Sequence, residues 1–470
     1  MDLGFETCGN ATIIVYDRGV PVLVTDPWLK GAQYFGSWRL PYDFTPTHQA
    51  AFAQARYVWL SHGHPDHLNL ESLESFRNRT LLLPRHYGGR ISADLKAAGY
   101  RVQDLENRRW LQLSPRVRIL TCADWNQDAA VLVALGEQCA VLDLNDGSAL
   151  GTRLTLKSNL RRFRRRFVLR LFNYGDADMI NLFTESGERI PPTPPERKPL
   201  GYFYSALLDE WNGTHTAPFS CHHTYARTDS QWATEYETPL GDHGRCFKST
   251  LGEFIPGYFS YEVESDRITQ TPIVQRPRRF HEPAEFGDDW SDALDADDVQ
   301  TLRSYFRKFE HVRRHFRFIN ARVGGRDHFV DLEGPLEYAP LEYAPLKDTK
   351  ERGITFEAPR HSLMTAVRCE IFDDLLIGNF AKTTLHGGVK SLYPDFTPYV
   401  AKYGDNGRAF SASEIDEYFR THRRECGFHA WVDQIRVDSA RKLRRRVVAS
   451  LSGSPALYLA ARRVYRRYMA

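Results

Sequence analysis

The sequence has few cysteines, and no two of them stand in the Cys-x-x-Cys spacing. The seven cysteines are scattered, at positions 8, 122, 139, 221, 246, 369 and 426. A chain of 470 residues can bury a large core without covalent cross-links. We therefore expect no disulfide framework and a reducing environment.

Long apolar runs are also absent. No run approaches the roughly 18 apolar residues of a membrane-spanning helix. The first residues, Met1 to Glu6, lack the basic and apolar regions of a signal peptide. The net charge of +3 is too small for the whole molecule to act as a polyanion binder. We expect a cytoplasmic location and no specific nucleic-acid partner.

One stretch is rich in residues that bind metals. The apolar run Tyr57 to Leu60 predicts a short buried strand, and His62, His64, Asp66 and His67 follow it directly. Imidazole and carboxylate are ligands of zinc and similar ions. An extended loop can point His62 and His64 the same way, while Asp66 and His67 face a second ion close by. A histidine-rich surface loop is the alternative.

Strands and helices alternate around this stretch. Ile13 to Tyr16 and Val20 to Val24 predict a β-hairpin, followed by Asp26. Asp26 stands at a strand end, where it could accept the outer N–H of a ligating histidine or simply belong to a turn. Further apolar runs predict strands at 117–121, 130–135 and 139–144, with helices at 70–77 and 93–99. This pattern favours a two-sheet α/β sandwich.

The histidine motif resembles the metal-binding signature of the metallo-β-lactamase superfamily. The segments Asp26 to Gly31 and Leu144 to Asp146 are similar to the branch that contains CMP-N-acetylneuraminate hydroxylase, and also to N-acylphosphatidylethanolamine phospholipase D and lactonase-like enzymes. The resemblance covers about the first half of the chain. It implies an α/β fold, a four-layer αββα sandwich, here with a smaller C-terminal α+β extension.

The resemblance also implies a ligand set. Asp146 matches an aspartate that bridges two cations. A histidine is expected before it, but the segment Cys122 to Asp128 has none, so we assign that role to Asp124, with Asp128 as the second choice. A carboxylate in place of an imidazole favours iron or manganese over zinc, or an incomplete first site.

A last histidine is needed to complete the second site. The candidates are His215, His222 and His223, of which we favour His222 or His223. Nearby, Tyr225 and Arg227 could bind an anionic substrate, and a structural salt bridge is the equal alternative for Arg227.

We divide the chain into residues 1–275, a metallo-β-lactamase-like metal-binding domain; 276–298, a linker rich in proline and acidic residues; 299–440, a C-terminal domain of unknown role; and 441–470, a basic amphipathic tail. Helices are expected at 299–319 and 364–380. The tail predicts peripheral contact with an anionic membrane, or a solvated terminal helix. The basic stretch 161–167 likewise predicts a solvated face or a site for anionic groups. The oligomeric state is not predicted.

The expected function is metal-dependent hydrolysis of an anionic ester, phosphoester or lactone-type substrate. The substrate would be a small molecule or a compound derived from a lipid or sugar. One or two divalent ions, zinc first and iron or manganese as alternatives, would activate water, with Asp66 and Asp146 as catalytic residues. An iron-dependent redox enzyme related to sugar-nucleotide hydroxylases is a second possibility. The ligands of the Rieske cluster that such a hydroxylase carries are not found, which disfavours an internal electron relay. A noncatalytic binding protein on a decayed site is the third.

Overall fold

The computed structural model describes residues 1–124, 128–192, 199–332, 351–404 and 407–428, together with Trp431 and Ile435. The basic tail predicted at 441–470 lies outside the described residues, so its membrane contact stays a prediction. In the described part of the chain, no helix is both long and apolar enough to cross a membrane.

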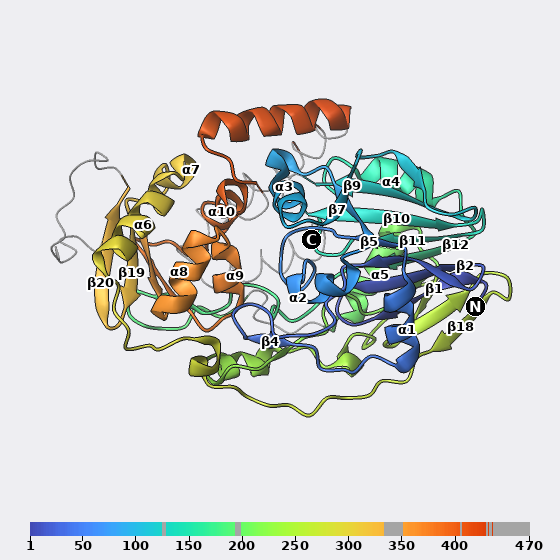
Figure 1. The fold of residues 1–470 in the computed structure, drawn as a ribbon, viewed down its shortest axis with the longest axis horizontal. Helices are drawn as coiled ribbons and strands as arrows, with labels where there is room; N and C mark the ends of the chain where they lie inside the picture. The colour runs from blue at the N-terminus through green and yellow to red at the C-terminus, as the bar shows by residue number, and fades with distance from the viewer. Residues whose placement is uncertain are drawn as a thin grey trace, which may run out of the picture.

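Two large sheets form the first half of the molecule (Figure 1). The first has the order β18-β17-β1-β2-β3-β5-β6-β7, and the second has the order β16-β14-β12-β11-β10-β9-β8. Strands β3, β5, β6 and β7 run parallel, as do β11, β12, β14 and β16. The bounds in the first sheet are β1 Leu3–Cys8, β2 Thr12–Asp17, β3 Val20–Thr25, β5 Tyr57–Trp59, β6 Thr80–Pro84, β7 Arg101–Leu105, β17 Phe259–Glu262 and β18 Arg267–Gln270. In the second they are β8 Trp110–Gln112, β9 Val117–Ala123, β10 Ala129–Leu135, β11 Cys139–Asp143, β12 Arg165–Leu169, β14 His215–Thr216 and β16 Glu253–Phe254.

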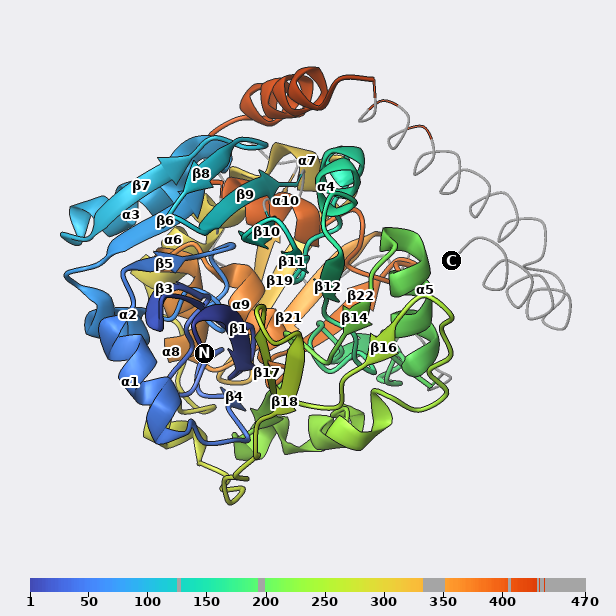
Figure 2. The same ribbon diagram turned by 90° about the vertical axis from the view of Figure 1, so that its right-hand side faces the viewer.

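The two sheets pack face to face, and helices cover their outer faces (Figure 2). Apolar residues of both sheets, such as Phe5, Val131 and Phe167, share one buried core. A second core lies between the first sheet and α1 Pro46–Gln54, α2 Leu70–Leu73 and α3 Arg90–Ala97. A third lies between the second sheet and α4 Arg153–Leu160 and α5 Gly201–Trp211. The predicted four-layer αββα arrangement is therefore confirmed.

A third sheet, with the order β13-β22-β21-β19-β20, lies in the other half of the molecule. Its strands are β13 Leu182–Thr184, β19 Phe318–Val323, β20 Arg326–Asp331, β21 Gly353–Glu357 and β22 Lys382–His386. Most of this half follows residue 290, but β13 and the buried side chains of Trp28, Tyr34 and Trp38 also belong to it. The smaller C-terminal α+β extension is thus present, and earlier segments complete its core. The exact domain boundaries stay a prediction.

The helices of this half differ from the expected ones. The segment 299–319 forms α6 Ala296–Arg307, the short α7 Glu310–Arg313 and the start of β19. The segment 364–380 is divided between α8 Arg360–Arg368 and α9 Phe372–Ile377, because Glu370 has a left-handed φ of 56° and interrupts the helix. Helix α10, Thr397–Tyr403, follows β22 in this half.

A further helix, 412–428, lies across the top of the molecule in Figure 1. The Tyr418 hydroxyl donates a hydrogen bond to the backbone carbonyl of Asp124, over 2.9 Å. Tyr87 donates to the backbone carbonyl of Glu414, over 2.7 Å. This helix therefore contacts the sandwich beside the strand ends described next.

Candidate metal centre

Three strands of the two sheets end at one edge of the sandwich. Strands β3 and β5 are parallel neighbours, and the Asp26 amide, just beyond β3, donates to the Trp59 carbonyl at the end of β5. The loop 61–67 begins there, and Asp146 follows the end of β11 in the second sheet. Because the side chains that follow these strands meet at one edge, the histidine motif and Asp146 lie together.

The first group of metal-binding atoms comes from His62, His64 and Asp146. The Nε2 atom of His62 lies 2.9 Å from Nδ1 of His64 and 3.9 Å from Oδ2 of Asp146. Each of the three residues offers one ligand atom, and the three atoms lie within 4.8 Å of one another. An ion can therefore be bound by all three after small side-chain adjustments.

The second group comes from Asp66, His67 and the same Asp146. The His67 Nε2 atom lies 3.2 Å from Oδ2 of Asp66 and 3.5 Å from Oδ2 of Asp146. One oxygen of Asp146 thus faces both groups. A carboxylate in this position can connect two cations.

Other side chains hold these ligands. Asp26 is fully buried and accepts from Nδ1 of His67, over 3.1 Å, and from the amide and hydroxyl of Ser61, over 2.8 and 2.7 Å. The predicted contact between Asp26 and a histidine of the motif is therefore present. Such a contact fixes the histidine tautomer that presents Nε2 to a metal.

Three supporting residues were missed by the sequence reasoning. Asn10 donates to Oδ2 of Asp66, over 2.8 Å, and Tyr34 donates to Oδ1 of Asp66, over 2.5 Å. Ser220 donates to Oδ1 of Asp146, over 2.8 Å. They come from distant turns and loops, and no local pattern marks them.

The electrostatics keep some of these ligands, but not all, in their metal-binding forms. Burial, reinforced by His67 and His64, holds the pKa of His62 well below its usual value, so its imidazole is neutral. Burial opposes ionisation of Asp66, but His67 and Tyr34 outweigh it and lower its pKa to about 2. For His64, burial is outweighed by Asp373 and Asp374, which raise its pKa to about 10. Burial is likewise outweighed at His67, where Asp66 and Asp146 raise the pKa well above its usual value. A metal must therefore displace a proton from both His64 and His67.

The three candidates for the last histidine lie in different environments. His215 stacks on Phe167 in the core between the sheets, with ring centroids 4.6 Å apart. His222 packs against Tyr258, and its Nε2 atom lies 3.4 Å from the Pro218 carbonyl. His223 stacks on Trp38, with ring centroids 3.6 Å apart, and its charge would interact with that of Asp66.

His223 is best placed to join the second group. Both of its ring nitrogens are buried without a hydrogen-bond partner, and so is Nε2 of His67. The Nε2 atom of His223 lies 3.6 Å from Oδ2 of Asp176. Unsatisfied buried imidazole nitrogens are costly unless something binds them. These nitrogens and the neighbouring carboxylates fit a bound divalent ion.

Asp124 and the two predicted substrate residues are not brought into these groups. Oδ2 of Asp124 accepts from the amide and hydroxyl of Ser148, over 2.9 and 2.6 Å. The guanidinium of Arg227 is fully buried between Asp229 and Asp288. The Tyr225 hydroxyl donates to the Asp176 carbonyl, over 2.6 Å. Arg227 and Tyr225 therefore contact protein groups in the core, and the role of Asp124 as a ligand stays a prediction.

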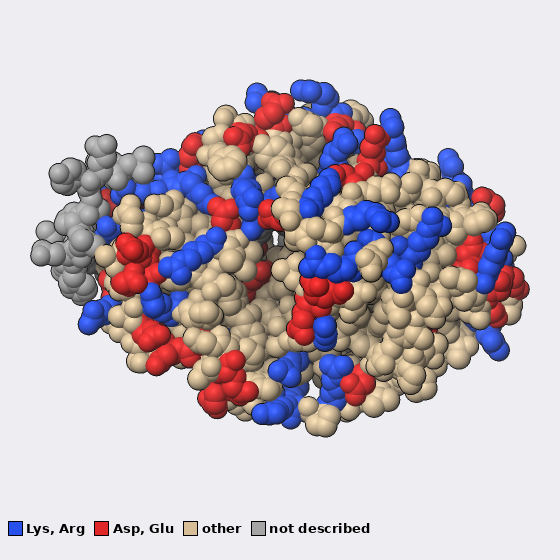
Figure 3. All heavy atoms as spheres, viewed as in Figure 1, with Lys and Arg blue, Asp and Glu red and all other residues tan. Residues whose placement is uncertain are grey.

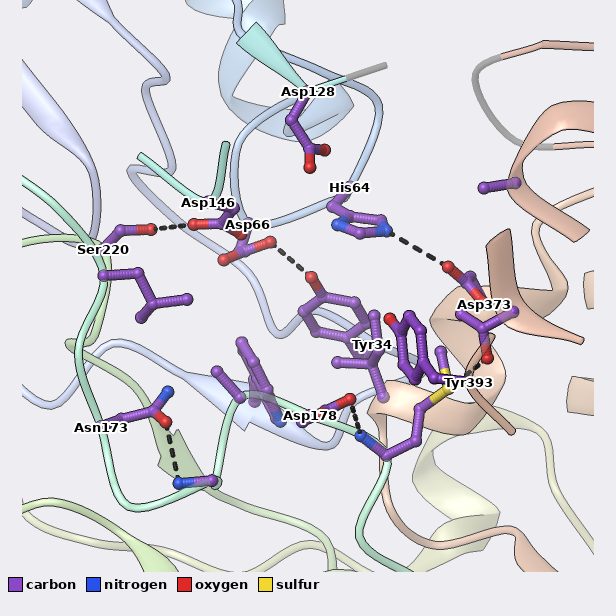
Figure 4. Close-up of a pocket in the computed structure, with 18 of the residues that line it drawn as sticks. Tyr34, His64, Asp66, Asp128, Asp146, Asn173, Asp178, Ser220, Asp373 and Tyr393 are labelled. Atoms are coloured by element: carbon purple, nitrogen blue, oxygen red, sulfur yellow. Dashed lines mark hydrogen bonds and ion pairs between the residues drawn. The ribbon is translucent and has the colours of Figure 1, made fainter. Parts of the chain in front are cut away.

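A cavity of about 430 Å³ opens onto the metal-binding groups. Its walls come from both halves of the molecule, and Figure 4 shows His64, Asp66 and Asp146 facing Asp373 and Tyr393 across it. In the space-filling view, a hollow lies between the halves, with Lys and Arg on the outer surface around it (Figure 3). Five aspartates line the cavity, whereas none of the described lining residues is lysine or arginine: Asp66, Asp128, Asp146, Asp178 and Asp373.

No family model matches the sequence. Over 109 residues the chain is 25% identical to cytidine monophosphate-N-acetylneuraminic acid hydroxylase of Asterias rubens, a match that spans 22% of this chain and only 17% of that protein.

Two similar solved structures are a metallo hydrolase from Ignicoccus hospitalis and a metallo-β-lactamase fold protein from Bacillus subtilis. The first is 12% identical, with a TM-score of 0.36 over 56% of this chain and 99% of that one. The second is 10% identical, with a TM-score of 0.30 over 54% of this chain and 91% of that one. The four layers of this chain, with the motif at the strand ends, match the fold that the predicted resemblance to the metallo-β-lactamase superfamily implies.

Proposed function

We propose that the protein is a metal-dependent hydrolase. The observation that carries the proposal is the position of Asp146, whose Oδ2 atom faces both groups of ligands beside the cavity. One or two divalent ions would be held by six residues: His62, His64, Asp66, His67, Asp146 and His223. A bound divalent ion lowers the pKa of a coordinated water toward neutrality and polarises a carbonyl or phosphoryl oxygen.

The protein's own residues orient the reacting groups. Asn10 and Tyr34 fix both oxygens of Asp66, and its low pKa keeps the carboxylate ionised at neutral pH. A carboxylate this acidic is a weak base, so Asp66 acts by accepting a hydrogen bond from water and orienting it. Ser220 fixes the other oxygen of Asp146, which leaves Oδ2 free to face the two groups.

The substrate proposal changes in one respect from the sequence prediction. The basic stretch 161–167 does not line the cavity, and Arg164 and Arg165 both pair with Asp266. In a cavity walled by aspartates, a negative charge on the substrate is stabilised only close to the metal ions. We therefore propose an ester, phosphoester or lactone that either is neutral or carries its charge only at the reacting group. The remainder of the substrate would pack on the apolar walls, such as Phe172, Met179 and Ile377.

Zinc is the first choice of metal. The carboxylates around the histidines also suit iron or manganese, and this favours an iron-dependent redox enzyme as the second candidate. A noncatalytic binding role is the third. The three differ in what the metal-loaded protein does to a substrate.

The test is a hydrolysis assay with matched substrates. Protein loaded with zinc, manganese or iron is assayed on a neutral lactone, a phosphodiester and an ester with a remote carboxylate, beside the double variant His62→Ala/His64→Ala. The proposal predicts metal-dependent turnover of the lactone or phosphodiester, little turnover of the remotely charged ester, and no turnover by the double variant. Metal retention with no hydrolysis, but with oxygen consumption when iron and a reductant are supplied, would support the redox candidate instead.

A further inference from the structure

The two ring nitrogens of His64 face opposite halves of the molecule. Nδ1 lies 2.9 Å from Nε2 of His62, on the side of the proposed metal. Nε2 points the other way, toward Oδ2 of Asp373 at 3.8 Å, as the dashed line in Figure 4 shows. A metal bound at Nδ1 leaves the proton of the neutral ring on Nε2, where it needs an acceptor.

Asp373 is placed to be that acceptor. It lies in the first turn of α9, in the C-terminal half, and lines the cavity with only 4% of its surface exposed. Its Oδ1 atom is buried and has no hydrogen-bond partner among the described residues. A buried carboxylate is costly unless it is paired, so its place beside a histidine ring calls for an explanation.

The charged groups around Asp373 come from four segments of the chain. Asp374 follows it on α9, Lys402 lies on α10, His64 approaches from the motif loop, and Asp178 belongs to the loop before β13. The side chain of Lys402 donates to the Pro398 carbonyl, over 3.0 Å. Among the described residues, Asp373 forms an ion pair only with His64.

We infer that Asp373 is a positioning residue of the metal centre. The 3.8 Å between Oδ2 of Asp373 and Nε2 of His64 is longer than a hydrogen bond, so a small side-chain movement on metal binding would bring Asp373 to accept the Nε2 proton. That contact would fix the tautomer and ring orientation that present Nδ1 to the metal. The inference rests on the proposed metal site. In this arrangement, a residue of α9 in the C-terminal half orients a metal ligand that belongs to the sandwich.

The first test measures metal affinity. Cobalt(II) is titrated into the metal-free protein against a competing chelator, for the wild type and for Asp373→Ala, Asp373→Asn and Asp373→Glu. Asp178→Asn is the matched control. Asp178 lines the same cavity but, in the described part of the chain, forms no hydrogen bond or ion pair with a histidine. We expect Asp373→Ala and Asp373→Asn to weaken the ion bound at His62 and His64 by about 10- to 100-fold. Asp373→Glu should recover part of the loss, and Asp178→Asn should stay within about twofold.

Three outcomes overturn the inference. Unchanged affinity and an unchanged cobalt absorption spectrum in Asp373→Ala would remove the role of Asp373 but leave the proposed hydrolase intact. An equal loss in Asp178→Asn would mean that any charge on the cavity wall matters. A wild type that binds no cobalt would overturn both the inference and the proposed function.

A second measurement does not depend on a folded variant. Nitrogen-15 NMR of the zinc-loaded wild type reports which nitrogen of each histidine carries the proton. The inference predicts that Nε2 of His64 is protonated. A proton on Nδ1 of His64 in the zinc-loaded protein would contradict it.

Discussion

Replacing Asp26 by asparagine should lower both the metal affinity and the free energy of unfolding. The two effects have different causes and can be measured separately. Asp26 is fully buried, and its Oδ2 atom accepts from Nδ1 of His67, from the Ser61 hydroxyl and from the side-chain amide of Asn145. Its Oδ1 atom accepts from the Ser61 amide. An asparagine has one acceptor oxygen, so its NH₂ group must face one of these donors.

The size of each effect follows from the contacts. Losing one hydrogen bond to a charged acceptor and leaving a buried donor unpaired should lower the free energy of unfolding of the metal-free protein by about 2–3 kcal/mol. Losing the negative charge behind His67 should weaken the metal at the second group by about 10- to 100-fold, or about 1.4–2.8 kcal/mol.

The assay combines urea denaturation of the metal-free protein with chelator competition. The control is Asp288→Asn, since Asp288 is also buried but accepts from Arg227 and Ser362, neither of which is a proposed metal ligand. The control should lose stability but keep its metal affinity. If Asp26→Asn bound metal within about twofold of the wild type, the supporting role of Asp26 would be refuted.

The remaining predictions concern the last histidine, pH and the buried arginine. His223→Ala should lose one metal per chain and His222→Ala should lose none; elemental analysis of both variants decides, and the reverse result would move the ligand to His222. Burial lowers the pKa of His243 to about 3 and that of His215 to about 4. Their pKa in the unfolded chain is about 6.5, so each histidine should lower the free energy of unfolding by roughly 1.4 kcal/mol per pH unit as the pH falls from about 6.5 toward 4. A free energy of unfolding that urea denaturation shows to be constant over this range would contradict the prediction. Arg227→Ala should lower the free energy of unfolding by about 3–5 kcal/mol, because it leaves Asp288 buried without its charge partner; a change below about 1 kcal/mol would return Arg227 to the list of substrate contacts.

The parts of the site predictable from the sequence are those set by local chain geometry. His62, His64, Asp66 and His67 follow one strand within six residues, so the end of that strand is enough to group them. Asp26 was predictable because an acid just beyond a strand lies at the same sheet edge. The four-layer fold followed from the alternation of strands and helices and from the resemblance that the motif carries.

The other contacts depend on tertiary packing, which no local pattern encodes. Asn10 and Tyr34 reach Asp66 from separate turns, and Asp373 reaches His64 from a helix about 300 residues away. His223 is distinguished from His222 by which ring stacks on Trp38, and adjacent residues in the sequence cannot show this. The expected helix at 299–319 was too long because the apolar residues at its end, Phe318 and Ile319, begin a buried strand.

Two groups of ligands that share Asp146 are proposed to bind metal ions. The most direct measurement is elemental analysis of protein purified without added metal and then reconstituted, for the wild type and for His62→Ala/His64→Ala. We expect about two zinc, manganese or iron ions per chain in the wild type, and loss of the ion at the first group in the double variant. No bound metal in the reconstituted wild type, or an unchanged metal content in the double variant, would contradict it.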